Sequence, residues 1–151
     1  MSERLLPIRT EAEVVSQTPS GVGWTLRLDA GPAWPGSEPG QFVMLAPGPV
    51  GAAPRTDPLL PRPMAVFRSS GSQLEVLYKV VGRGTALLAA AQPGERVALV
   101  GPLGGGFPLP APEERALLVG GGTGIASLYD LADAAQRAGA SVSVLLGARQ
   151  A

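Results

Sequence analysis

The 151-residue sequence contains no cysteine and no histidine. Within these residues that excludes disulfides and thiolate-bound metals, and it removes both the commonest zinc ligand and the commonest general base. Only one of the 12 basic residues is a lysine, Lys79, and the 12 acidic residues bring the formal net charge to zero. This balance gives no electrostatic footprint for binding nucleic acid or an anionic membrane.

Long apolar runs are also missing. No stretch of the sequence approaches the ~20 residues that a membrane-spanning helix needs. The start of the chain, from Met1 to Pro7, has charges but no apolar segment of the length that a signal peptide requires. We therefore expect a cytoplasmic protein with no membrane partner and no nucleic-acid partner.

Glycine and proline are abundant, at 21 and 16 residues, and they separate short apolar runs. Residues 22–28 alternate, with Trp24, Leu26 and Leu28 facing one way, which is the period of a half-buried strand. Strands are predicted over 11–18, 22–28, 41–46, 64–67, 73–81 and 95–100, with a short helix over 85–91 and a long loop over 47–63. Six short strands and one short helix predict an antiparallel six-stranded β-barrel over residues 1–108, so the fold class is mainly β.

The character of the sequence changes after the loop over 101–112. An apolar strand over 116–119 leads into a glycine turn, an amphipathic helix and a second apolar strand over 141–146. The predicted buried face of the helix carries Ile125, Leu128, Tyr129, Ala132 and Ala135, and Gly139 stands where the helix should end. We predict the first βαβ unit of an incomplete α/β nucleotide-binding domain over 113–151. A lone two-stranded parallel sheet cannot cover both of its faces, so the rest of the domain or another chain should do so.

Two segments of the barrel are candidates for binding phosphate. The first is the turn VGRGT at 81–85, where Gly84 and Thr85 open a helix whose first amides lack internal partners. An ordinary strand-to-helix turn with a threonine cap explains the same spacing. The second is Arg62-Pro63-Met64-Ala65, where an arginine at a strand start can grip a phosphate; a plain surface arginine is the alternative.

The glycine turn is the third candidate, formed by Gly120, Gly121, Gly122, Thr123 and Gly124. It has the strand before it and the helix after it that a dinucleotide turn requires, but not the strict G-x-G-x-x-G spacing. The acidic residue that would bind the ribose is absent, and Arg149 lies near the end of the second strand instead. NAD and NADP therefore remain open. No catalytic residue and no metal ligand is predicted.

In this order, the segments resemble the ferredoxin reductase superfamily and, within it, most of all the electron-transfer subunit of class 1B dihydroorotate dehydrogenase. The matching stretches are PGQFVM (39–44), DPLLPRP (57–63), LYKVVGRGT (77–85), GPLG (101–104) and VGGGTGIASL (119–128). The run over 77–85 is the most specific, because many reductases share the glycine turn.

The resemblance implies a role for each candidate. Arg62, Pro63, Met64 and Ala65 would lie along the flavin of FAD, with Arg62 on its phosphate. Leu77, Tyr78 and Lys79 would line the isoalloxazine, and Gly84 and Thr85 would hold the pyrophosphate. The turn from Gly120 to Gly124 would receive NAD(H). Such a subunit passes electrons from NADH through FAD and a [2Fe–2S] cluster to a dihydroorotate dehydrogenase catalytic subunit, as a heterotetramer.

The sequence departs from the family at four points. Ala65 replaces the usual serine, which should weaken flavin binding by about 1 kcal/mol. Pro61 and Ser127 replace a usual arginine and a usual proline. There is no cysteine, although the cluster needs four thiolates, so this chain cannot ligate it. We therefore expect a truncated or degenerate subunit. A reductase component of another redox system, or a non-catalytic flavin-binding or interaction module, remains an alternative, and whether the chain is an enzyme stays open.

Overall fold

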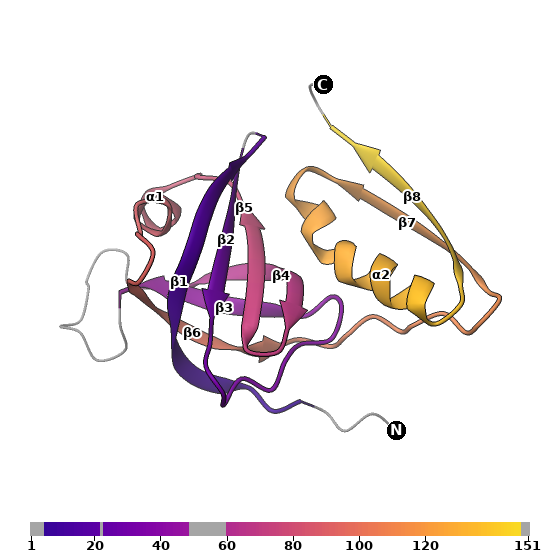
Figure 1. The fold of residues 1–151 in the computed structure, drawn as a ribbon. Helices are drawn as coiled ribbons and strands as arrows, with labels where there is room; N and C mark the ends of the chain where they lie inside the picture. The colour runs from indigo at the N-terminus through magenta and orange to yellow at the C-terminus, as the bar shows by residue number, and fades with distance from the viewer. Residues whose placement is uncertain (1–4, 22, 49–59, 149–151) are drawn as a thin grey trace.

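The computed structural model describes residues 5–21, 23–48 and 60–148. Most of the predicted loop over 47–63 and Arg149 lie outside this described part of the chain. Six strands pair antiparallel and close into a barrel in the order β1-β2-β5-β4-β3-β6, which confirms the predicted barrel (Figure 1). The strands are β1 (Ile8–Ser20), β2 (Gly23–Asp29), β3 (Phe42–Pro47), β4 (Arg62–Ser70), β5 (Gln73–Tyr78) and β6 (Arg96–Leu103).

The barrel is filled by the inward-facing residues of all six strands. In β2, Leu26 and Leu28 are fully buried while Arg27 is exposed, as the alternating pattern predicts. Trp34 from the loop after β2 and Leu88 from α1 (Arg83–Ala89) also belong to this core. The core consists of Ala12, Val14, Leu26, Leu28, Ala30, Trp34, Val43, Leu45, Met64, Val66, Leu74, Val76, Tyr78, Leu88, Val97 and Leu99.

β-Bulges in β1 and β4 change which residues face inward. The pairing of β1 with β2 shifts between Val14 and Ser16, so that Val14 opposes Leu28 and Gln17 opposes Leu26. One extra residue reverses the alternation, because successive side chains point to opposite faces of a strand. Gln17 therefore turns toward the barrel interior. A second shift lies between Val66 and Arg68 in β4.

A second unit follows the barrel. Its strands β7 (Arg115–Gly121) and β8 (Ser141–Gly147) are parallel, and between them come the 3-10 helix η1 (Gly122–Ser127) and the α-helix α2 (Tyr129–Arg137). The predicted βαβ unit is therefore present. Helix α2 lies on the side of this sheet that faces the barrel (Figure 1).

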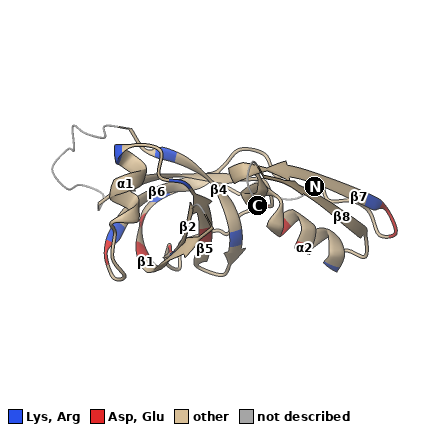
Figure 2. Ribbon diagram, turned by 90° about the horizontal axis from the view of Figure 1, so that it is seen from above, with Lys and Arg blue, Asp and Glu red and all other residues tan. Residues whose placement is uncertain are grey.

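The other face of the two-stranded sheet is open, as expected for a lone parallel pair. Leu117 and Val119 of β7 are 62% and 67% exposed, and Leu145, which pairs with Val119, is 58% exposed. Acidic and basic residues are scattered over both units (Figure 2). Among the residues that the structure describes, no helix combines the length and the apolar character needed to cross a bilayer.

The second unit differs from the sequence prediction in two ways. Gly120 and Gly121 end strand β7, and the expected turn is a 3-10 helix that begins at Gly122. Tyr129 was expected on the buried helix face but is 40% exposed and packs on the barrel, whereas Ala126, Leu131 and Ala135 are buried. The 3-10 turn rotates the start of α2. A single α-helical period applied to residues 125–135 therefore places Tyr129 on the wrong face.

Candidate functional site

The N-terminal end of α1 is built around the hydroxyl of Thr85. This Oγ1 atom accepts hydrogen bonds from the backbone N–H groups of Val81 (2.9 Å) and Gly82 (3.2 Å), and it donates one to the Gly82 carbonyl (2.9 Å). Thr85 is only 5% exposed. Its hydroxyl is therefore used to fold the turn, and a ligand at this end of the helix would meet backbone amides rather than the Thr85 side chain.

Arg62 lies directly against Gly84, although the two come from different elements. A Cβ atom added at Gly84 would lie 2.8 Å from Arg62 Nε and 3.1 Å from Arg62 Cζ. The Nη1 atom of Arg62 donates a hydrogen bond to the Leu60 carbonyl at 2.6 Å. Because Gly84 has no side chain, the Arg62 guanidinium can lie next to the N-terminus of α1. Both groups attract phosphate.

The remaining barrel candidates divide between the two faces of β4 and β5. Met64 and Tyr78 are 7% and 3% exposed and their side chains belong to the core. Ala65 and Leu77 alternate with these buried residues and face outward, half-buried, while Pro63 and Lys79 are exposed. A flat ring system on the outer surface of these strands would meet Ala65 and Leu77 directly, whereas Met64 and Tyr78 could reach it only through their backbone.

The side chain of Tyr78 is tied to α1 through Gln17. The Tyr78 hydroxyl donates to Gln17 Oε1 at 2.8 Å, and Gln17 Nε2 donates to the carbonyls of Leu88 (2.7 Å) and Ala91 (3.3 Å). Burial raises the pKa of Tyr78 to about 12. Sequence reasoning missed Gln17, because only the bulge in β1 turns it inward and no sequence signal marks that bulge.

The five residues of the glycine segment have different surroundings. A Cβ atom at Gly120 would lie 2.6 Å from Leu128 Cδ1, so Gly120 allows the following helix to pack closely on the strand. Gly122 has a φ of +57°, which favours glycine, and a Cβ atom at this position would have no other atom within 4 Å. Gly121, Gly122, Thr123 and Gly124 are all exposed. This is a backbone surface that a nucleotide phosphate could approach.

The structure brings the three candidate segments to neighbouring strands. Arg62 and Gly84 meet directly, Ala65 and Leu77 lie on adjacent strands, and η1 lies against both β4 and β5. Residues that could hold a flavin nucleotide thus surround the outer surface of β4 and β5, and the glycine segment comes from the other unit. The pair formed by Arg62 and the N-terminus of α1, which we call the phosphate grip, and the outer face of β4 and β5 are suited to the phosphate and the ring of FAD. The glycine segment is suited to a nicotinamide nucleotide.

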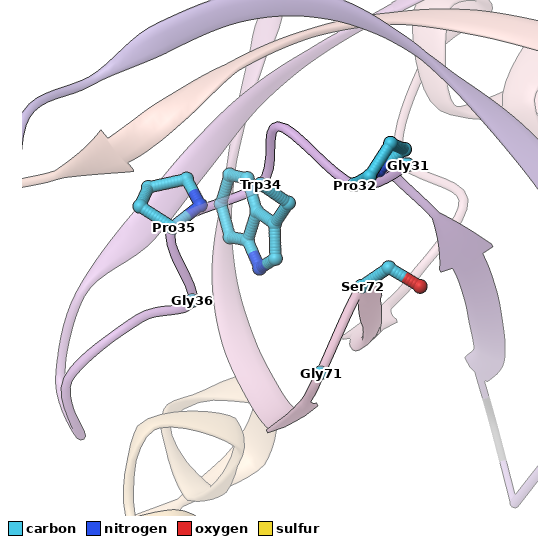
Figure 3. Close-up of a pocket in the computed structure, with 7 residues that line it drawn as sticks. All are labelled: Gly31, Pro32, Trp34, Pro35, Gly36, Gly71 and Ser72. Atoms are coloured by element: carbon cyan, nitrogen blue, oxygen red, sulfur yellow. The ribbon is translucent and has the colours of Figure 1, made fainter.

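A shallow depression of about 440 Å³ lies elsewhere on the barrel. It is lined by the loop after β2 and by the β4–β5 turn, namely Gly31, Pro32, Trp34, Pro35, Gly36, Gly71 and Ser72 (Figure 3). Because Ser72 precedes β5 and Lys79 follows it, the depression is at the opposite end of that strand from the candidate site. It shares no residue with the site described above.

The fold is that of the ferredoxin reductases. The NADH-dependent reduced ferredoxin-NADP oxidoreductase superposes with a TM-score of 0.75 and 27% identity, covering 100% of this chain and 51% of that one. A cytochrome P450 reductase from Amycolatopsis gives 0.74 and 28%, covering 96% and 44%. Phthalate dioxygenase reductase gives a TM-score of 0.72 at 20% identity, which supports the fold alone. These matches confirm the predicted fold class.

In sequence the chain resembles the electron transfer subunit of dihydroorotate dehydrogenase B (NAD(+)). It is 46% identical to that of Geobacillus kaustophilus over 114 residues, and 37% identical to that of Bacillus velezensis over 119 residues. The aligned parts are 73% and 76% of this chain but 42% and 44% of those relatives, so the chain spans less than half of their length. No family model matches the chain. The relationship inferred from the sequence motifs is confirmed.

Proposed function

We propose that this chain is the flavin-binding part of an electron-transfer flavoprotein. Residues 1–108 would bind FAD, and residues 113–151 would form the start of an NAD-binding unit. The observation that carries the proposal is the contact between Arg62 and Gly84, which places a guanidinium at the N-terminus of α1. The similarity to electron transfer subunits supports the same conclusion.

Different residues of the site would bind different parts of FAD. Arg62 would bind a phosphate oxygen through its guanidinium, and the amides of Gly84 and Thr85 would face the pyrophosphate, with the Thr85 hydroxyl keeping the turn in shape. The outward faces of Pro63, Ala65, Leu77 and Lys79, with the backbone of Met64 and Tyr78, would support the flavin ring. Bound FAD accepts two electrons together from a nicotinamide and releases them singly.

The electron donor and acceptor are inferred from the relatives. The glycine segment from Gly120 to Gly124, which is exposed at residues 121–124, would receive NADH. The acceptor would be a dihydroorotate dehydrogenase catalytic subunit, in a heterotetramer. The chain has no cysteine, so we propose that it does not itself hold a [2Fe–2S] cluster.

Titration of the purified chain with FAD, followed by flavin fluorescence, tests the binding site. The Arg62→Ala variant should bind FAD about tenfold or more weakly, because a hydrogen bond to a charged group contributes about 1.5–3 kcal/mol. Arg9→Ala is the matched control, since Arg9 is an exposed arginine on β1 of the same barrel. Equal losses in the two variants, or no flavin binding by the wild-type chain, would contradict the assignment.

A second candidate is a non-catalytic flavin-binding or interaction module. The open apolar face of β7 and β8 favours it, because Leu117, Val119 and Leu145 are exposed as they would be at a binding surface. Reduction of an artificial dye by NADH with added FAD separates the two candidates. An electron-transfer flavoprotein should reduce the dye, and a non-catalytic module should not. A tight complex with a dihydroorotate dehydrogenase catalytic subunit would exclude a role in another redox system.

A further inference from the structure

One contact between the two units is made by an aromatic side chain. Tyr129, the first residue of α2, places its ring 4.9 Å from the ring of Phe67 in β4, with the two planes tilted by 45°. The guanidinium of Arg68 lies over the same Tyr129 ring, 4.0 Å from its centre. Aromatic pairs and cation–π contacts at these distances are attractive and depend on orientation. The contact therefore fixes an angle as well as a distance between the units.

The barrel side of this contact depends on the bulge in β4. In a regular strand, Phe67 and Arg68 would point to opposite faces, and only one of them could reach Tyr129. The pairing of β4 with β5 shifts between Val66 and Arg68, so Phe67 is the inserted residue. Both neighbouring side chains then reach the outer surface, where both contact the Tyr129 ring. Bulges re-aim side chains in this manner, often beside functional sites.

The contact joins the two halves of the candidate site. Phe67 is two residues beyond Ala65 on the outer face of β4, where the flavin ring is proposed to lie. Tyr129 is two residues beyond the end of η1, which holds the exposed glycines. A movement of Tyr129 would therefore move the glycine segment relative to the flavin face.

We propose that Tyr129 is a positioning residue that holds the glycine segment of the nucleotide-binding unit at a fixed place over the flavin-binding strands. The inference rests on the proposed function, because it concerns hydride transfer from NADH to FAD. The hydride carries two electrons and a proton, so the transfer leaves NAD⁺ and reduced FAD. The proposed role requires no contact between Tyr129 and either ligand. Tyr129 acts through Phe67 and Arg68 on one side and through η1 on the other.

The test compares Tyr129→Leu with Tyr129→Phe in the full chain loaded with FAD. The phenylalanine variant keeps the ring and is the matched control. In the leucine variant, backbone amides of residues 122–127 should exchange hydrogen faster while the barrel strands exchange as in the wild type. FAD affinity should stay unchanged, and the limiting rate of flavin reduction at saturating NADH should fall by about tenfold or more, because small misplacements of reacting groups are costly.

Each outcome has a defined meaning. Equal hydrogen exchange over residues 122–127 in both variants would overturn the proposal, whatever the rate of flavin reduction by NADH. Faster exchange with an unchanged reduction rate would overturn the positioning role. If the wild-type chain with FAD is not reduced by NADH, the proposed function fails, but the exchange experiment still tests the contact. If Tyr129→Leu unfolds the second unit, the barrel-side variant Phe67→Leu with Arg68→Gln removes the same contact from strand β4. Because Phe67 lies on the proposed flavin face, this variant is judged by hydrogen exchange over residues 122–127.

Discussion

Replacing Gly84 with alanine should weaken FAD binding while leaving the free protein as stable as before, or more stable. The added Cβ atom would lie 2.8 Å from Arg62 Nε, whereas an ordinary contact is near ~3.5 Å, so the guanidinium must retreat by about 0.7 Å. A flexible arginine can do so at little cost to the fold. Alanine also stabilises a helix by about 1 kcal/mol relative to glycine. Loss of the arginine–phosphate bond removes about 1.5–3 kcal/mol of binding energy, which is about 10- to 100-fold in affinity.

The assay is a fluorescence titration with FAD, accompanied by thermal melting of the flavin-free protein. Gly82→Ala is the control, because it changes the same turn but its Cβ atom would meet nothing within 4 Å, and the extended backbone at Gly82 suits any residue. Gly82→Ala should therefore bind FAD as the wild type does. If Gly84→Ala also bound FAD with wild-type affinity, the guanidinium and the helix end would not act on a common phosphate, and the reasoning would be refuted.

Three further predictions concern single side chains. Because burial raises the pKa of Tyr78 from 10.0 to about 12, the unfolded chain ionises first, and stability should fall as the pH rises from 10 to 12. Tyr78→Phe should abolish this fall in urea denaturation, while costing about 1–2 kcal/mol near neutral pH by leaving Gln17 without its donor. Burial likewise raises the pKa of Asp130, so its ionised form is disfavoured in the folded state. Asp130→Asn removes the partly buried charge and should raise the melting temperature at pH 7, an advantage that should vanish below the ordinary carboxyl pKa of 3.8. Finally, Ala65→Ser should tighten FAD binding by about 1 kcal/mol, roughly fivefold, in the same fluorescence titration. An unchanged affinity would show that the position-65 side chain does not face the flavin.

Local patterns predicted the elements of the fold well. The alternation around Leu26 and Leu28 identified strand β2 and its buried face, and Gly139 indeed ends α2 with a φ of +90°. These features depend on a few neighbouring residues, whose preferences are visible in the sequence. The predicted loop over 101–112 was too long at its start, because Gly101 to Leu103 extend strand β6.

Features that depend on pairing between distant segments could not be predicted. Nothing in the spacing of Arg62 and Gly84 shows that the arginine fills the space left by the glycine. The bulges that turn Gln17 inward and bring Phe67 and Arg68 to one surface arise from the register between strands, which the sequence does not display. The burial of Tyr129 was predicted wrongly because the 3-10 turn changes the face on which it lies, and its aromatic partner belongs to the other unit.

The amide of Gln17 acts as an anchor for α1 at the end away from the phosphate grip. It binds the carbonyls of Leu88 and Ala91 near the C-terminal end of a helix of seven residues, which is about 10 Å long. A swing of about 10° around this anchor would carry the amides of Gly84 and Thr85, which are about 8 Å from it, sideways by roughly 1 Å, enough to weaken a hydrogen bond. The direction in which α1 aims its N-terminus is thus set by a residue inside the barrel, which a flavin on the outside would never touch.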